Sequence, residues 1–169
     1  MIRRCDSGDI EAIRTIINAA ARAYKGVIPA DRWREPYMPE AELRHEIEAG
    51  VGFWGYHEDG WLRGVMGIQG VQDVTLIRHA YVAPAYQRRG IGGALLDRVG
   101  GETTRPILIG TWAAAGWAVR FYEKHGFRPV SAEATRTLLK RYWSVPDRQI
   151  ETSVVLADAA WLARGGAAG

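Results

Sequence analysis

Residues 82–98 read VAPAYQRRGIGGALLDR and place two arginines, Arg88 and Arg89, beside three closely spaced glycines at 90, 92 and 93. The stretch lies between an apolar run typical of a strand and an amphipathic run typical of a helix. Glycine costs about 1 kcal/mol relative to alanine inside a helix, so glycines in a first helical turn need a reason. The first N–H groups of a helix lack internal partners and carry the positive end of its dipole. The pattern therefore predicts a phosphate-binding turn, with the arginines adding charge for a diphosphate.

Two better-known phosphate loops are excluded by the residues that follow. A P-loop ends in Gly-Lys-Ser/Thr, whereas this turn continues into Ala94 and Leu95. A dinucleotide fingerprint needs glycine or alanine at position 95. The alternative without a ligand is a tight turn that allows close helix packing, and the paired arginines favour the phosphate interpretation over it.

Two motifs in order resemble the acetyl-CoA binding core of the GNAT superfamily of N-acetyltransferases. The first, QRRGIG at 87–92, matches the family signature Gln/Arg-x-x-Gly-x-Gly/Ala. The second, AVRFYEKHGF at 118–127, matches a downstream helix that ends in Phe-Tyr-x-x-x-Gly-Phe. The order of expected elements from about residue 1 to residue 156 follows the family as well. The resemblance implies an acetyl-CoA-dependent transfer to a primary amine of a small molecule or a protein, without a covalent acyl-enzyme and without a metal.

The resemblance also assigns roles to individual residues. The strand ending at Tyr81 and Val82 would diverge from the strand PILIGTW, and Val82 would bind the pantetheine arm through its backbone. The pyrophosphate would be covered by the turn and the first helical residues: Gln87, Arg88, Arg89, Gly90, Ile91, Gly92, Gly93 and Ala94. Tyr122 would lie near the thioester sulfur as the catalytic acid, the alternative being a core aromatic residue.

The chain departs from the family pattern at two positions. Ala115 stands where many members have an asparagine, and Leu76 stands where some have a glutamate base. The identity of the general base that would deprotonate the amine is therefore open: it is either a water relay or a residue elsewhere in the chain. These departures keep a second hypothesis, a non-catalytic acyl-CoA-binding sensor of the same fold.

Candidate acceptor-site residues come from two regions. A local bulge decides whether Arg78 or His79 faces the substrate, Arg78 to bind an acidic group or His79 to act as the base. Tyr24 and Trp33, with Tyr37, lie in the expected two-helix region and either line an acceptor pocket or pack the helices on the sheet. The identity of the amine is left open.

The hydrophobic periods predict one α+β domain over residues 1–160 and a flexible tail over 161–169. Helices are expected at 6–25, 30–50, 90–101, 116–126 and 135–143, and an antiparallel meander spans 51–83. Strands at 106–112 and 149–157 would complete a mixed, mostly antiparallel sheet of about six to seven strands flanked by helices.

Composition excludes several classes of function. The 169 residues carry a net charge of +3, and the scattered arginines argue against a nucleic-acid surface. Four histidines without ligand-like spacing and the single Cys5 indicate neither a metal site nor a disulfide. Without a signal-like or membrane-spanning run, we expect a cytoplasmic protein, free of membrane contacts, that is compatible with a homodimer.

Overall fold

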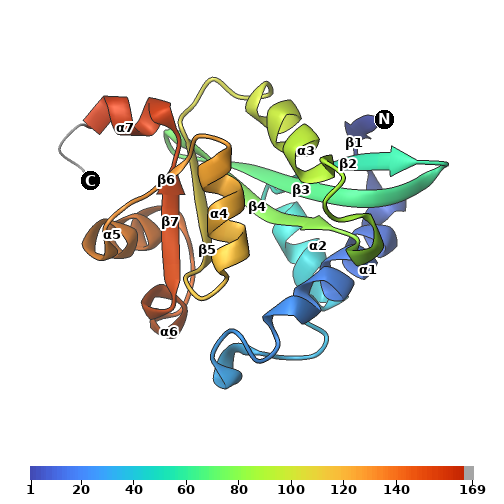
Figure 1. Ribbon diagram of the computed structural model, residues 1–169, viewed down its shortest axis with the longest axis horizontal. Coiled ribbons are helices and arrows are strands. Elements are labelled where there is room, and N and C mark those ends of the chain that lie inside the picture. Colours follow the sequence, from blue (N-terminus) through green and yellow to red (C-terminus); the bar gives the residue numbers. More distant parts are fainter. Residues whose placement is uncertain (166–169) are drawn as a thin grey trace.

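A seven-stranded sheet forms the centre of the computed structural model, which describes residues 1–165 (Figure 1). The strands are β1 (Ile2–Arg4), β2 (Gly52–Glu58), β3 (Trp61–Val71), β4 (Val74–Val82), β5 (Ile107–Trp112), β6 (Arg128–Pro129) and β7 (Ser153–Ala157). Their spatial order is β1-β2-β3-β4-β5-β7-β6, and β4–β5 is the parallel pair among antiparallel neighbours. The expected mixed, mostly antiparallel sheet is confirmed.

Helices cover both faces of this sheet. They are α1 (Ile10–Ala21), α2 (Glu40–Glu48), α3 (Ile91–Gly100), α4 (Gly116–Lys124), α5 (Ala132–Tyr142), α6 (Asp147–Glu151) and α7 (Ala159–Gly165). Alternation along each strand explains the layers, because successive side chains point to opposite faces. Ile77 packs in the cluster beneath α3 and α4, whereas its neighbour Leu76 packs with Leu138 of α5. Val65 joins the cluster formed by α1 and α2.

The β4–β5 pair ends early. The two strands pair only from Thr75–Ile107 to Ile77–Ile109, although both continue beyond. Figure 1 shows them separating, with α3 and α4 on one face of the gap. The backbone of β4 after Ile77 therefore has no strand partner on that edge, as the sequence predicts for the stretch ending at Tyr81 and Val82.

A bulge interrupts the other edge of β4. Gly67 of β3 pairs with Arg78 and Val65 with Tyr81, so two residues of β4 oppose one of β3. His79 lies in the bulge with a φ of +54°, in the left-handed region. Gly67 is required here, because a Cβ on it would lie 2.8 Å from the carbonyl oxygen of Arg78.

The expected elements differ from the observed ones toward the C-terminus. Residues 149–151 belong to α6 rather than to a strand, since Pro146 ends the preceding extended segment and the helix carries Ile150 into the core. The tail expected over 161–169 is helical through residue 165, and Trp161 is buried against Tyr142. Residues 166–169 lie outside the described part of the chain.

The region before β2 is less helical than expected. Only Glu40–Glu48 forms an α-helix, preceded by a loop over 25–39 that contains one short 3-10 turn. Pro36 and Pro39 account for this, since proline removes a helical hydrogen bond and restricts the residue before it. Across residues 1–165, none of the helices combines the length and the apolar character needed to cross a bilayer.

Replacement of Gly67 by alanine should disrupt the bulge. The added methyl would lie 2.8 Å from a backbone oxygen and 3.0 Å from Val51, neither of which moves freely. We expect Gly67→Ala to lower the free energy of unfolding by about 1–3 kcal/mol in urea titration. Gly100→Ala is the matched control, because nothing lies within 4 Å of its added Cβ at the end of α3. Equal stability of the two variants would contradict this account.

Candidate active site

The glycine–arginine turn forms an anion cradle at the N-terminus of α3. Gly90 is the N-cap in the left-handed region (φ +82°), and Arg88 before it also has a positive φ of 64°. Within residues 1–165, the backbone N–H groups of Arg88, Arg89 and Gly90 have no hydrogen-bond acceptor. Free amides at a helix N-terminus suit a phosphate or a diphosphate. Ala94, predicted to join them, instead donates its N–H to the carbonyl of Gly90 at 3.0 Å.

Some side chains around the cradle hold the turn in place, and others form no ion pair. The amide of Gln87 donates to the carbonyl of Val82 at 3.1 Å and so ties the turn to the end of β4. The guanidinium of Arg89 lies 4.9 Å from the ring centre of Tyr86, which also contacts Arg63 at 4.2 Å. Arg88 forms no ion pair with any residue of 1–165. Arg89 forms no ion pair there either, so both guanidinium groups are available for an anion, and Arg88 is the one without an aromatic partner.

Gly92 and Gly93 serve packing as well as the cradle. A Cβ on Gly92 would lie 3.2 Å from the ring of Phe121, and one on Gly93 would lie 3.0 Å from His125 Nε2. Both neighbours belong to the end of α4 and the residue after it. The absence of side chains at these glycines therefore lets α3 and α4 approach, so close helix packing explains part of the motif.

Tyr122 lies on the inner side of α4. It is buried and packs edge-on against Phe121 and Phe127, with ring centres 5.1 and 6.0 Å apart. Burial, with a smaller contribution from Tyr24, raises the pKa of Tyr122. The hydroxyl has no hydrogen-bond partner among residues 1–165. It is thus a neutral donor without a partner in the described part of the chain, next to the region where β4 and β5 diverge.

A cavity of about 130 Å³ occupies the divergence of β4 and β5. Its lining is largely aromatic and comes from both halves of the sheet: Tyr24, Tyr37, Ile77, Arg78, His79, Tyr81, Gly110, Thr111, Trp112, Leu139, Trp143, Val145, Gln149 and Ser153. Among them, the ring centre of Tyr24 lies 5.5 Å from that of Tyr37 and 6.3 Å from that of Tyr81. Trp33 is not part of the lining but stacks on Tyr37. Burial raises the pKa of Tyr37 to about 12, so its phenol stays neutral.

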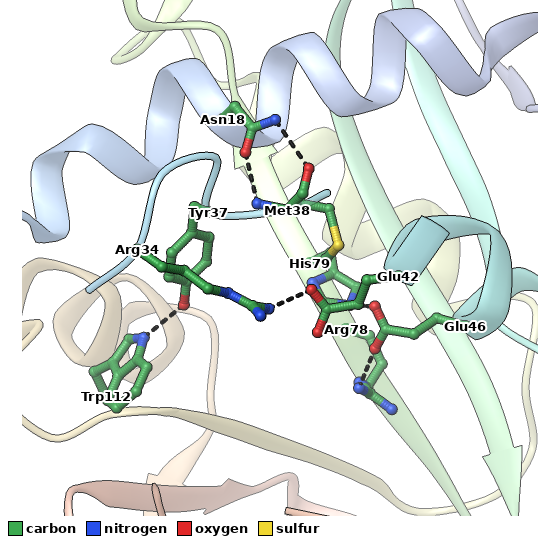
Figure 2. Close-up of polar contacts among 9 residues, drawn as sticks. All are labelled: Asn18, Arg34, Tyr37, Met38, Glu42, Glu46, Arg78, His79 and Trp112. Atoms are coloured by element: carbon green, nitrogen blue, oxygen red, sulfur yellow. Dashed lines mark hydrogen bonds and ion pairs between the residues drawn. The ribbon is translucent and has the colours of Figure 1, made fainter. Parts of the chain in front are cut away.

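The loop over 25–39 borders this cavity through Tyr37 and is held by polar contacts (Figure 2). Asn18 of α1 holds it through a reciprocal pair of hydrogen bonds to the backbone of Met38, at 2.7 and 3.0 Å. The indole of Trp112 on β5 donates to the hydroxyl of Tyr37 at 2.9 Å. Arg148 of α6 pairs with Asp31 at 3.0 Å. The loop therefore contacts both halves of the sheet.

The bulge turns Arg78 and His79 toward the same residue, Glu46 of α2. Arg78 Nη2 lies 2.5 Å from Glu46 Oε1, and His79 Nε2 lies 2.8 Å from Glu46 Oε2. Burial would raise the pKa of Glu46, but His79 and Arg78 outweigh burial and lower it. The sequence left open which of the two faced the cleft, and the structure brings both to one carboxylate. Leu76, at the position of the family's glutamate base, is fully buried.

Sequence reasoning missed Glu46 and Trp112. Glu46 is one of several acidic residues on a polar helix, and nothing in its spacing distinguishes it. Trp54 of β2 lies outside this lining, and its ring centre is 4.6 Å from the guanidinium carbon of Arg98. Cys5 is half-buried, and burial raises its thiol pKa to about 12, so it is not a nucleophile. Residues 1–165 hold no cluster suited to a metal ion.

Comparison with known proteins agrees with this geometry. Residues 16–140 match the family described as "Acetyltransferase (GNAT) domain". The peptidyl-lysine N-acetyltransferase YiaC of Escherichia coli K12 is 29% identical over 133 residues, which cover 77% of this chain and 84% of that protein.

Solved structures share the fold at low identity. PaiA N-acetyltransferase from Thermoplasma acidophilum, in complex with coenzyme A, has a TM-score of 0.69 at 17% identity, covering 94% of this chain and 97% of that one. The ribosomal-protein-S18-alanine N-acetyltransferase from Escherichia coli has a TM-score of 0.65 at 18% identity, covering 94% and 92%. The family match spans most of the chain and includes the cradle and Tyr122. The protein therefore belongs to the GNAT family of acetyltransferases and is an acyltransferase that uses acetyl-CoA.

Proposed function

We propose that this protein transfers the acetyl group of acetyl-CoA directly to a primary amine. The observation that carries the proposal is that three groups lie along the gap where β4 and β5 diverge. The anion cradle lies on the α3 side of the gap, Tyr122 lies beside the cradle, and the aromatic cavity lies at the other end. Such an arrangement lets pyrophosphate, thioester and amine occupy successive parts of one cleft. Holding both reactants in one orientation is itself worth several kcal/mol.

The cradle would hold the diphosphate through the amides of residues 88–93 and the charge of Arg88. The free edge of β4 after Ile77 would bind the pantetheine arm. Val82 contributes to this edge, although its carbonyl already accepts from Gln87. Acetyl-CoA supplies an activated thioester carbonyl, and the chain's residues orient it and exclude water from it.

The neutral amine would attack that carbonyl carbon, and the carbon–sulfur bond would break as the nitrogen–carbon bond forms. Tyr122 would donate a hydrogen bond to the sulfur as negative charge develops there. Since burial raises the pKa of Tyr122, its phenol is present in the donating form at neutral pH. The raised pKa suits stabilisation of a thiolate better than complete proton transfer, because an alkyl thiol has a pKa near 8.5.

The acceptor side favours an amine on a slender apolar chain. Tyr24, Tyr37 and Trp112 provide aromatic walls, and the loop over 25–39 limits the width of the opening. A lysine side chain has this shape, and the similar YiaC is a peptidyl-lysine N-acetyltransferase. We propose an amine of this kind, free or in a protein, as the acceptor.

Thiol release from acetyl-CoA tests the proposal. We expect turnover with at least one member of a panel containing free lysine, a lysyl peptide, an alanyl peptide amine and arylalkylamines. Cys5 should not disturb the measurement, because its raised pKa leaves it protonated at the assay pH. Tight acetyl-CoA binding without turnover on any amine would favour the sensor hypothesis instead.

Arg88 and Arg89 should differ in their electrostatic contribution to CoA binding. An exposed charge near a diphosphate is screened by salt, so affinity should fall as ionic strength rises through about 0.1 M. In titration calorimetry, Arg88→Ala should flatten that dependence. Arg89→Ala is the matched comparison and should flatten it less, because Arg89 rests on Tyr86. Identical salt slopes in the parent and Arg88→Ala would disprove the role of Arg88.

Removal of the Tyr122 hydroxyl should slow the chemical step. Tyr122→Phe keeps the ring in its contacts with Phe121 and Phe127, so CoA affinity should be retained. We expect kcat to fall at least about 30-fold, since a positioned donor contributes roughly 10²–10⁴-fold. Tyr56→Phe on β2 is the control and should leave kcat unchanged. If Tyr122→Phe turned over at nearly the parental rate, its hydroxyl would be structural.

A further inference from the structure

The pairing of two consecutive β4 residues with one carboxylate needs a specific backbone. Neighbouring side chains of a regular strand point to opposite faces, so Arg78 and His79 could not both reach Glu46. The bulge resolves this, because His79 has a φ of +54° and its side chain turns toward α2. Residues other than glycine rarely adopt this conformation, and bulges of this kind concentrate beside active sites. The strand is thus distorted in a way that aims His79.

The side chain of His79 is held from two directions. Its ring stacks on Phe53 with centres 6.2 Å apart and planes 22° from parallel. Its Nε2 lies 2.8 Å from Glu46 Oε2, and the His79 side chain is only 16% exposed. Glu46 is fixed in turn by Arg78, which also donates to Gln69 at 3.0 Å. The imidazole therefore has a defined orientation in the substrate-free protein.

The contact between His79 and Glu46 is close but not aligned as a hydrogen bond. Both Nε2 of His79 and Oε2 of Glu46 are buried without a hydrogen-bond partner of good geometry in residues 1–165. Buried polar atoms in this state are uncommon and call for an explanation. Catalytic hydrogen bonds are often misaligned before substrate binds and tighten in the complex. The unsatisfied contact therefore marks the His79–Glu46 pair as a candidate for a role beyond packing.

His79 also lies on the acceptor side of the cleft. It lines the cavity together with Tyr24 and Tyr81, and Tyr24 is in turn close enough to Tyr122 to affect its pKa. Two cationic side chains near this end are paired: Arg34 of the loop binds Glu42 of α2, and Arg78 binds Glu46. The phenols of Tyr24, Tyr37 and Tyr81 are held neutral by burial. His79 is the imidazole in this lining, and imidazole is the side chain most often used as a general base.

We propose that His79 is the proton acceptor for the amine and that Glu46 is its positioning residue. The inference rests on the proposed function. The acceptor arrives as an ammonium ion and loses one proton to the imidazole, with Nε2 held by Glu46 and Nδ1 as the accepting atom. The freed nitrogen lone pair attacks the thioester carbonyl. The carbon–sulfur bond then breaks as the amide forms, the second amine proton passes to the departing sulfur to give the free thiol, and the imidazolium returns its proton to solvent.

Two substitutions of His79 test the proposal without altering its backbone. Glycine and asparagine both tolerate a positive φ, so His79→Gly and His79→Asn keep the bulge. We expect each to lower kcat/KM for the amine at least about 100-fold with CoA affinity unchanged. Added imidazole should restore activity to His79→Gly, whereas pyrazole, of the same shape but a much weaker base, should not. His57→Ala on β2 is the control and should behave as the parent.

The positioning role of Glu46 is tested by replacing it with glutamine, which keeps the shape of the side chain and removes its charge. Glu46→Gln should lower kcat by about tenfold or more with little change in KM, and should add no further loss in the His79→Gly background. Glu48→Gln is the control and should leave kcat unchanged, because Glu48 is an exposed residue of the same helix that forms no ion pair within residues 1–165. Two results would overturn this inference and leave the proposed function intact, provided that the parent is active. One is a His79→Asn variant that keeps nearly full kcat/KM. The other is a His79→Gly variant that responds equally to imidazole and pyrazole. A parent inactive on every amine would instead defeat the proposed function.

Discussion

The early end of the β4–β5 pairing is the constraint on which the site depends. Parallel strands normally satisfy each other's backbone groups along their length. Here they do so for three residue pairs, after which β4 has a free edge and β5 turns away. Packing maintains the separation: α3 and α4 cover one face of the sheet, and the aromatic cluster around Tyr24 packs against Trp112 of β5 and Tyr81 of β4. The cleft is therefore part of the sheet itself and not a gap between loops.

Each end of the cleft depends on a local departure from regular structure. At one end, the turn at Arg88 to Gly90 leaves amides free because it enters α3 through a left-handed residue. At the other end, the bulge in β4 joins Arg78 and His79 to α2. The bulge lies in β4, and the turn at Arg88 to Gly90 lies in the segment of chain that follows β4. The short chain between them sets the spacing of the diphosphate, thioester and amine regions.

Contiguous sequence motifs and hydrophobic periods predicted the glycine–arginine turn and the fold. They could not predict contacts between residues far apart in the sequence. The glycines, the arginines and the helix with Tyr122 are contiguous motifs, and the periods of β2 to β5 are regular. Glu46 was not predictable, because its importance comes from a bulge 32 residues away that turns His79 toward it. The end of the chain was misjudged for a similar reason. The helix at Ala159–Gly165 is stabilised by burial of Trp161 against α5 rather than by a strong local pattern.

The loop over 25–39 has a consequence for how this protein can change over evolutionary time. It is anchored by a few polar contacts, those of Asn18, Trp112 and Arg148, and it contributes no residue to the turn that precedes α3. Substitutions in the loop therefore reshape the walls around the incoming amine without touching the groups that face the diphosphate. On the proposed function, donor and acceptor recognition belong to separate segments of the chain, and substitutions in this loop change only the acceptor side.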